Sequence, residues 1–249
     1  MPQILTRQKL LDGKVVGIVS GLHDPDMVEY LGQLGPDGVW IECEHGGVDW
    51  KEIGDYARAC DLWGMASIVR VPTGEPWVIT RTLDRGASGI VVPHVSTAED
   101  AGRVGEAARF GPLGRRGMYG GRRSYGVGEY FARANDEILV TVLIEEIEAV
   151  RNLDEILKEE RIDVFFVAPS DLAQTMGHTG NIGHPEVQAT IDDALRKIVR
   201  AGRVAGALVS DDNRDRYLDL GARFVMTGWL PWVARGVTAF RDSLALRNR

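Results

Sequence analysis

Short apolar runs alternate along the whole chain with segments whose apolar residues recur at helical spacing. Eight runs are almost continuously apolar, as expected of parallel strands that are covered on both faces. They occupy residues 15–20, 38–43, 66–71, 89–94, 139–144, 163–168, 204–209 and 223–228. Helices are predicted to begin after Asp24-Pro25 and after Asp49, which forms a box-like cap with Glu52. Further helical segments lie at residues 75–85, 97–109, 146–159, 185–202, 213–220 and 231–246.

Eight strand–helix units without a long linker predict an α/β protein, a single (β/α)8 TIM barrel over residues 1–249. Residues 5–12 add a helix before the first strand. An open doubly wound sheet is the alternative, but GxGxxG is absent after the first strand and eight units exceed the usual count of that fold. The absent motif also argues against a nucleotide cofactor.

The last helical segment carries an apolar stripe, formed by Val233, Val237, Phe240 and Leu244. Such a stripe is expected to be buried against the helix's own barrel or against a neighbouring chain. We therefore expect a homo-oligomer in which this helix takes part in packing.

Composition excludes several functional classes. The formal net charge is −7 and neither basic runs nor aromatic–basic interleaving appear, so we expect no nucleic-acid or membrane partner. The N-terminus lacks the apolar core of a signal peptide and no run approaches membrane-spanning length. The two cysteines, Cys43 and Cys60, make neither a disulfide framework nor a CxxC site, so a reducing cytoplasm is expected.

Polar residues gather where the predicted strands end, which is where barrels of this kind place their active sites. They are Ser20, His23, Glu42, Glu44, His45, Arg70, His94, Glu145, Ser170, Asp171, Ser210 and Asp211. Helix-capping acids explain some of them. They do not explain Arg70 before Val71-Pro72, or Glu145 at the close of an apolar strand.

Glu145 and Asp171 end adjacent strands and should point into one mouth. Two carboxylates with few other protein ligands suit a hard divalent cation such as Mg²⁺ or Mn²⁺. Solvated loop acids, or a helix cap at Asp171, are the alternative. A zinc cage is disfavoured because the five histidines show no HxH spacing and CxxC is absent.

Two further strand-end residues are candidates for catalysis. Arg70 could hold a carboxylate or a developing enolate oxygen, or could instead form a salt bridge to Glu44. His45, between Glu44 and two glycines, suits proton transfer near neutral pH. No lysine falls at a strand end, which disfavours Schiff-base chemistry.

Several blocks in order make the chain similar to the metal-dependent pyruvate aldolases of the HpcH/HpaI type, which include 4-hydroxy-2-oxoheptanedioate aldolase and 2-dehydro-3-deoxyglucarate aldolase. The blocks are "EHGGVDW", "VRVP", "LDRGASGIVVPHVSTAEDA", "GRRG", "LIEEIEAVRNLDEIL", "APSDLAQTMGHTGNIGHPEVQ" and "RYLDLGARFV". The resemblance implies a class II aldolase that reversibly cleaves a 4-hydroxy-2-oxo acid to pyruvate, or a pyruvate analogue, and an aldehyde through a metal-stabilised enolate.

The resemblance also implies roles for individual residues. Glu145 and Asp171 would bind Mg²⁺, Mn²⁺ or Co²⁺, His45 would accept a proton, and Arg70 would stabilise the enolate. The aspartate that pairs with this histidine in the family falls at Asp84. Asp84 ends a predicted helix on the amino-end face of its own barrel, so it could reach His45 only from a neighbouring subunit, and the alternative is a surface salt bridge with Arg81 or Arg85. The resemblance implies an oligomer that is a multiple of three, such as a hexamer. The substrate-binding set would be Ala168, Pro169, Ser170 and Leu208.

The sequence departs from the family at Glu42, Leu143, Ala168 and Leu230, which leaves the aldehyde undefined. The stretch "GRRGMYGGRRSYGVGEY" suggests a glycine-hinged lid whose arginines Arg116, Arg122 and Arg123 meet an anionic substrate, or else a solvated basic loop. Three other functions stay open: a CoA-ester lyase of the same superfamily, a phosphate-binding barrel, and a non-catalytic barrel that acts as a binding protein.

Overall fold

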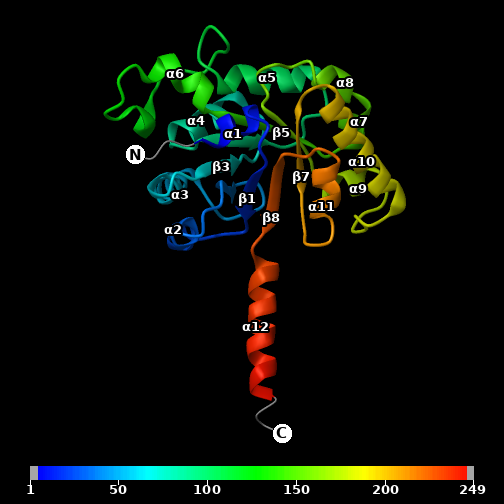
Figure 1. Cartoon of the computed structure of the whole chain (residues 1–249). Coiled ribbons are helices and arrows are strands. Elements are labelled where there is room, and N and C mark those ends of the chain that lie inside the picture. Colours follow the sequence, from blue (N-terminus) through cyan, green and yellow to red (C-terminus); the bar gives the residue numbers. More distant parts are fainter. Residues whose placement is uncertain (1–4, 246–249) are drawn as a thin grey trace.

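Eight parallel strands close into a barrel in which each strand pairs with its neighbours in sequence and β8 pairs with β1 (Figure 1). The computed structural model describes residues 5–245. The strands are β1 (Val16–Ser20), β2 (Gly38–Glu42), β3 (Ala66–Arg70), β4 (Gly89–Val92), β5 (Leu139–Ile144), β6 (Val164–Val167), β7 (Val204–Leu208) and β8 (Phe224–Gly228). Every predicted strand is present within two residues at each end, so the predicted TIM barrel is confirmed.

All the helices except the last surround the barrel, and the two that follow Asp24 and Asp49 begin at the predicted caps (Figure 1). They are α1 (Thr6–Leu11), α2 (Pro25–Gly32), α3 (Trp50–Leu62), α4 (Pro76–Asp84), α5 (Ala98–Ala108), the 3₁₀ turn η1 (Gly121–Ser124), α6 (Tyr130–Glu137), α7 (Ile147–Arg151), α8 (Leu153–Ile156), α9 (Pro169–Thr175), α10 (Pro185–Arg200), α11 (Arg214–Asp219) and α12 (Leu230–Ala245). Asp24 accepts a hydrogen bond from the Asp26 amide at 2.8 Å, and Asp49 forms a capping box with Glu52. The extra helix before β1 is confirmed as α1. The pattern did not predict α6 or α9, and Asn152 divides the predicted helix 146–159 into α7 and α8.

Two apolar layers hold the fold together. One lies between the strands and the outer helices, and the other fills the inside of the barrel. Within the barrel, the rings of Trp40 and Phe166 lie 5.3 Å apart and those of Phe166 and Phe224 lie 6.1 Å apart. Because the interior is packed rather than hollow, substrate chemistry has to take place above it, at the carboxyl ends of the strands.

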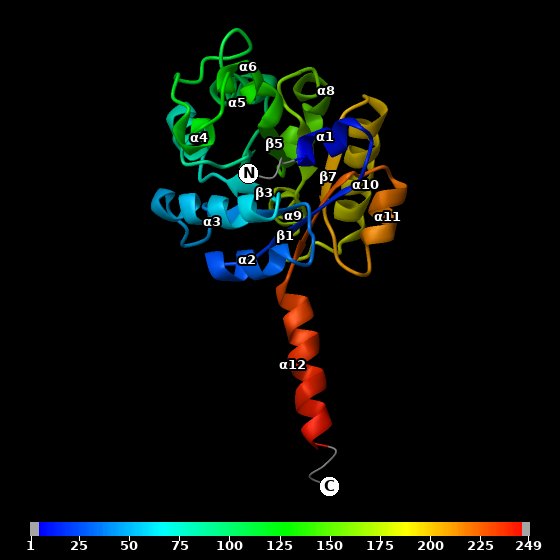
Figure 2. The same ribbon diagram turned by 60° about the vertical axis from the view of Figure 1, so that its left-hand side comes forward.

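The last helix, α12, departs from the expected arrangement. It leaves β8 and projects away from the barrel, as both views of the ribbon show (Figures 1 and 2). None of its residues is buried, and its apolar stripe is exposed by between 39% at Val233 and 67% at Phe240. Of the two predicted ways to bury the stripe, packing against its own barrel is therefore not observed.

No helix within residues 5–245 is long and apolar enough to cross a bilayer.

Candidate active site

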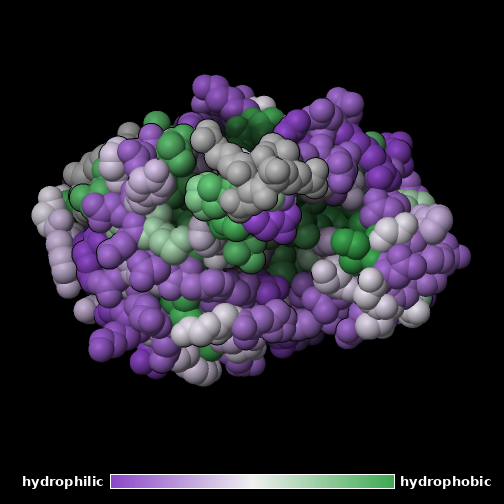
Figure 3. All heavy atoms as spheres, turned by 90° about the horizontal axis from the view of Figure 1, so that it is seen from below, coloured by the Kyte–Doolittle hydropathy of each residue, from purple (hydrophilic) through white to green (hydrophobic). Residues whose placement is uncertain are grey.

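The mouth of the barrel contains a pocket of about 270 Å³ that brings most of the predicted site together. Figure 3 looks onto this end of the molecule and shows an apolar hollow framed by polar side chains. The pocket is lined by Ser20, Gly21, His23, Trp40, Glu42, Arg70, Leu143, Glu145, Phe166, Ala168, Pro169, Ser170, Asp171, Leu208 and Met226. Both predicted metal ligands, Arg70 and the whole predicted substrate-binding set thus share one pocket.

Glu145 is the most buried carboxylate of the mouth. Its side chain is 2% exposed, and one oxygen accepts a hydrogen bond from the backbone amide of His94 at 2.8 Å. Burial raises the pKa of Glu145, and the negative charges of Asp171 and Glu44 add to that effect. A buried carboxylate with so few donors around it is poorly satisfied when it ionises, so it favours a nearby cation.

Asp171 lies in the first turn of α9 and faces the same pocket. Ala168 occupies the cap position of this helix, so Asp171 is not the helix cap that the alternative interpretation required. Its carboxylate has no hydrogen-bond or ion-pair partner among the side chains of residues 5–245. Glu145 and Asp171 therefore offer oxygen ligands from two adjacent strand ends, which is the donor chemistry that Mg²⁺ and Mn²⁺ prefer.

Arg70 is held by two carboxylates from the neighbouring strand end. Its Nε lies 2.7 Å from Glu42 Oε2 and its Nη1 lies 2.9 Å from Glu44 Oε2. The pair with Glu42 follows from the register, because Glu42 on β2 lies beside Arg70 on β3. The salt bridge to Glu44 that competed with a catalytic role is thus present. It leaves other guanidinium N–H groups available to a ligand, since arginine has five donors.

His94 is a site residue that sequence reasoning did not select. Its backbone adopts a left-handed conformation, with φ of 56°, which aims its amide at Glu145. Its imidazole lies 3.0 Å from Glu146 Oε1 and 3.4 Å from Glu44 Oε1. Burial alone would lower the pKa of His94, but the hydrogen bond to Glu146 and the charges of Glu145 and Glu44 raise it overall. A positive φ at a non-glycine residue costs about 1–3 kcal/mol, which points to a functional position.

The loop "ECEHGG" is organised by Glu42. The Glu42 carboxylate accepts hydrogen bonds from the amides of Glu44, at 2.8 Å, and His45, at 3.1 Å. A side chain at Gly46 would lie 2.5 Å from the Glu42 carbonyl oxygen, so glycine is required there. His45 itself is exposed at the rim and does not line the pocket. Burial raises the pKa of the Cys43 thiol to about 12, so this cysteine is not a nucleophile near neutral pH.

The mouth as a whole carries more negative than positive charge. Arg70 and His94 face an excess of carboxylates, namely Glu42, Glu44, Glu145, Glu146 and Asp171. Glu44 Oε2 is buried and, despite its closeness to Arg70, is not aligned for a hydrogen bond with any group in residues 5–245. This surplus of hard oxygen donors fits a divalent cation.

Asp84 and the arginine-rich segment lie at the opposite end of the barrel, where α4 ends. Asp84 pairs with Arg116 at 2.7 Å rather than with Arg81 or Arg85, and the Arg116 side chain is fully buried. Arg122 and Arg123 both pair with Asp61. In Figure 1 this segment lies around η1 and α6 at the end away from α12. The three arginines therefore do not reach the mouth of their own barrel, and a lid over that mouth does not fit this placement.

Fold and site together define a TIM-barrel enzyme with an acid-rich mouth. Residues 16–230 match the family described as HpcH/HpaI aldolase/citrate lyase, and the chain belongs to this family. It is thus a lyase of the aldolase type, as predicted.

Relatives with assigned activities share more than a third of the sequence. The chain is 39% identical over 221 residues to a hydroxypyruvate/pyruvate aldolase of Roseovarius nubinhibens, covering 86% of this chain and 85% of that protein. It is 39% identical over 218 residues to a 5-keto-4-deoxy-D-glucarate aldolase of Citrobacter koseri, covering 86% and 84%. A crystal structure of an HpcH/HpaI aldolase from Desulfitobacterium hafniense is 28% identical, with a TM-score of 0.85 over 95% of this chain and 96% of that one.

Proposed function

We propose that this enzyme is a divalent-metal-dependent aldolase that joins pyruvate, or a close analogue such as hydroxypyruvate, to an aldehyde and cleaves the resulting 4-hydroxy-2-oxo acid. The observation that carries the proposal is the surplus of carboxylates around Arg70 in a pocket large enough for a small oxo acid. The activities named for the two relatives at 39% identity support the substrate class.

Glu145 and Asp171 would hold the ion, which is Mg²⁺, Mn²⁺ or Co²⁺. They come from adjacent strand ends, and the charge of Asp171 contributes to the raised pKa of Glu145. When bound, the ion supplies Lewis-acid charge that favours the enolate form of the substrate. His94 holds Glu145 in place through its amide, and Glu44 in turn lies between His94 and Arg70.

Each remaining step falls to the chain's own groups. Arg70, fixed by Glu42 and Glu44, would stabilise the enolate oxygen. Backbone amides around Ser170 would take the substrate carboxylate, and Leu208 would contact the substrate in the same pocket. His45 would accept the proton that leaves the pyruvate methyl carbon, whose electron pair then forms the bond to the aldehyde carbon. The aldehyde oxygen takes up a proton to become the 4-hydroxyl group.

A second copy of the chain would complete the site. His45 is exposed at the mouth, whereas Asp84 lies at the other end of the barrel, so the two can meet only between chains. The projecting α12 offers its apolar stripe to a neighbour in the same way. The strand before it, β8, is only partly buried, and a side chain at Gly17 on the adjacent β1 would meet no atom within 4 Å. We infer reciprocal exchange of α12 within a homo-oligomer, built from trimers, in the cytoplasm.

A CoA-ester lyase is the competing function. It is less favoured because relatives named as aldolases match most of this chain. The test is a screen of aldehydes with pyruvate and hydroxypyruvate as donors, in the presence of Mn²⁺ and with product identified by mass. We expect aldol products that disappear on chelation. Turnover confined to CoA esters would overturn the proposal.

A further inference from the structure

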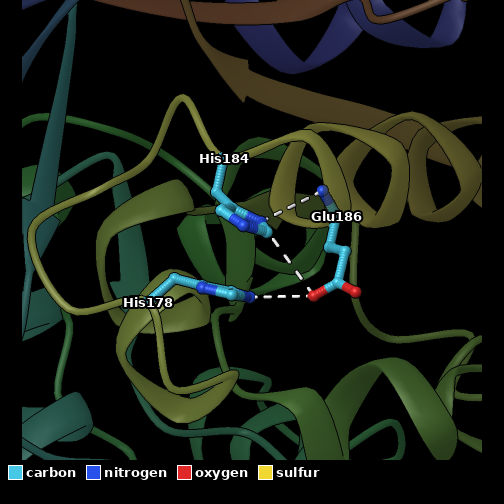
Figure 4. Close-up of side chains that lie close together, drawn as sticks. All are labelled: His178, His184 and Glu186. Atoms are coloured by element: carbon cyan, nitrogen blue, oxygen red, sulfur yellow. Dashed lines mark hydrogen bonds and ion pairs between the residues drawn. The ribbon is translucent and has the colours of Figure 1, made fainter.

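A second group of metal-binding side chains lies outside the mouth pocket, where the loop of residues 176–184 joins α9 to α10. It consists of His178, His184 and Glu186, each of which offers one ligand atom within 4.8 Å of the others. Figure 4 shows both imidazole rings beside the Glu186 carboxylate. His178 Nε2 lies 2.9 Å from Glu186 Oε2, and His184 Nδ1 lies 4.0 Å from the same oxygen.

The local fold holds the two rings together. His184 is the cap residue of α10, and its Nδ1 accepts a hydrogen bond from the Glu186 amide at 3.3 Å. His178 is held by its own amide, which donates to the Ala173 carbonyl at 2.7 Å, and its carbonyl accepts from Asn181. The rings stack with centroids 3.6 Å apart and an angle of 16° between their planes.

The stacked arrangement places the two rings beside one carboxylate, but one ring has to turn before both can bind the same ion, because the lone pair of a ring nitrogen lies in the plane of its own ring. The side chains of His178 and His184 are 23% and 31% exposed, so the rings are shielded while an ion can still enter. Glu186 is 71% exposed and free to turn from its hydrogen bond with His178 toward an ion.

We propose that His178, His184 and Glu186 bind one divalent ion of the zinc class, separately from the ion at the mouth. Two imidazoles and one carboxylate suit Zn²⁺, which takes three protein ligands and leaves a position for water. The oxygen-only donors at the mouth suit Mg²⁺ or Mn²⁺ instead. The bound ion would tie the loop that follows α9, whose first turn carries Asp171, to the first turn of α10.

The experiment measures zinc binding to tag-free protein, because a polyhistidine tail binds zinc itself. Zinc is titrated against a competing chromophoric chelator with excess Mg²⁺ present, in wild-type chain and in His178→Ala, Glu186→Gln and Asp171→Ala. We expect Asp171→Ala to retain one bound zinc, and His178→Ala to bind that zinc at least about tenfold more weakly. Thr179→Ala, an exposed position in the same loop, is the matched control and should bind as the wild type does.

Thermal unfolding supplies a readout that does not depend on stoichiometry. Zinc should raise the Tm of wild-type chain and of Asp171→Ala, and it should raise the Tm of His178→Ala less. The proposal is overturned if His178→Ala binds zinc as tightly as wild type, or if loss of zinc follows Asp171→Ala alone. Neither result bears on aldolase activity, so the two proposals stand or fall separately.

Discussion

The balance of arginines and carboxylates is opposite at the two ends of the barrel. At the amino end arginines outnumber the acids they contact: Asp61 holds Arg122 and Arg123, Asp163 holds Arg7 and Arg109, and Asp84 holds Arg116. At the mouth, carboxylates crowd around one arginine and one histidine, and Asp171 lacks a protein partner within residues 5–245.

The difference separates stability from function. Asp61 and Asp163 are satisfied by the chain itself, so removing either should cost folding energy and leave the chemistry alone, whereas Asp84 has the additional role proposed between chains. The acids of the mouth are incompletely satisfied until a cation and a substrate arrive, so removing one should cost activity more than stability.

The largest expected effect is the loss of activity in Asp171→Ala. Removing one of two metal ligands should lower turnover by at least about a thousandfold, because charge stabilisation of the enolate is lost. Aldol turnover measured with Mn²⁺, beside circular dichroism to show an intact fold, checks it. Chelator-treated protein should lose activity likewise, and full activity without metal would contradict the metal site.

The next effect concerns α12. Phe240→Asp places a charge in the exposed apolar stripe and should convert the oligomer to smaller species, with lower activity because Asp84 no longer meets His45. Size-exclusion chromatography with light scattering gives the mass. Arg241→Ala, at the next position of the same helix, is the control. A monomeric wild-type chain that keeps full activity would refute both the exchange of α12 and the role of Asp84 between chains.

At the amino end, Asp61→Asn should destabilise without impairing chemistry. Asp61 is buried and leaves two guanidinium groups uncompensated when its charge is removed, which costs about 3 kcal/mol of unfolding free energy. Urea unfolding measures this cost, and kcat at a temperature where the variant is folded should match the wild type. A large fall in kcat with unchanged stability would reverse the comparison between the two ends.

The smallest effect is a pH dependence at Glu145. Its raised pKa means that the metal-free folded chain keeps this proton above pH 4.5, the ordinary value, so stability falls as pH rises from 4.5 to the raised pKa and is level above it. A metal needs the ionised form. Affinity for Mn²⁺ should therefore weaken by about tenfold per pH unit below that pKa. Calorimetric titration of Mn²⁺ at several pH values checks it, and a pH-independent affinity from neutral to acid would contradict it.

The sequence predicted the barrel and the location of both metal-ligand candidates because each depends on local pattern and on strand order. The sequence did not identify His94 as a site residue, because its role depends on contacts with Glu145 and Glu146, more than fifty residues away. It also depends on a left-handed backbone angle that no sequence pattern encodes. The position of Arg116, Arg122 and Arg123 could have been foreseen, since the segment follows a helix and so returns to the amino end.

The direction of α12 could not have been foreseen from its sequence. An amphipathic stripe such as that of Val233, Val237 and Phe240 indicates that a helix face is to be buried. It does not indicate which molecule covers that face. Asp84 differs, because it ends a helix that returns to the amino end of the barrel, so the order of strands and helices already separates it from His45.

The most direct test of the mouth as a pyruvate aldolase site is exchange of the pyruvate methyl protons with D₂O. Proton NMR measures this exchange with Mg²⁺-loaded chain that is free of Mn²⁺. Enolate formation needs only pyruvate, the ion, Arg70 and a proton acceptor, so the methyl signal should fade without any aldehyde. Arg70→Ala should slow exchange by about 10²–10³, and His45→Ala should slow exchange far more than it slows oxaloacetate decarboxylation, which removes no carbon-bound proton. An unchanged methyl signal after prolonged incubation with folded, metal-loaded protein would contradict the assignment of the mouth as a pyruvate aldolase site.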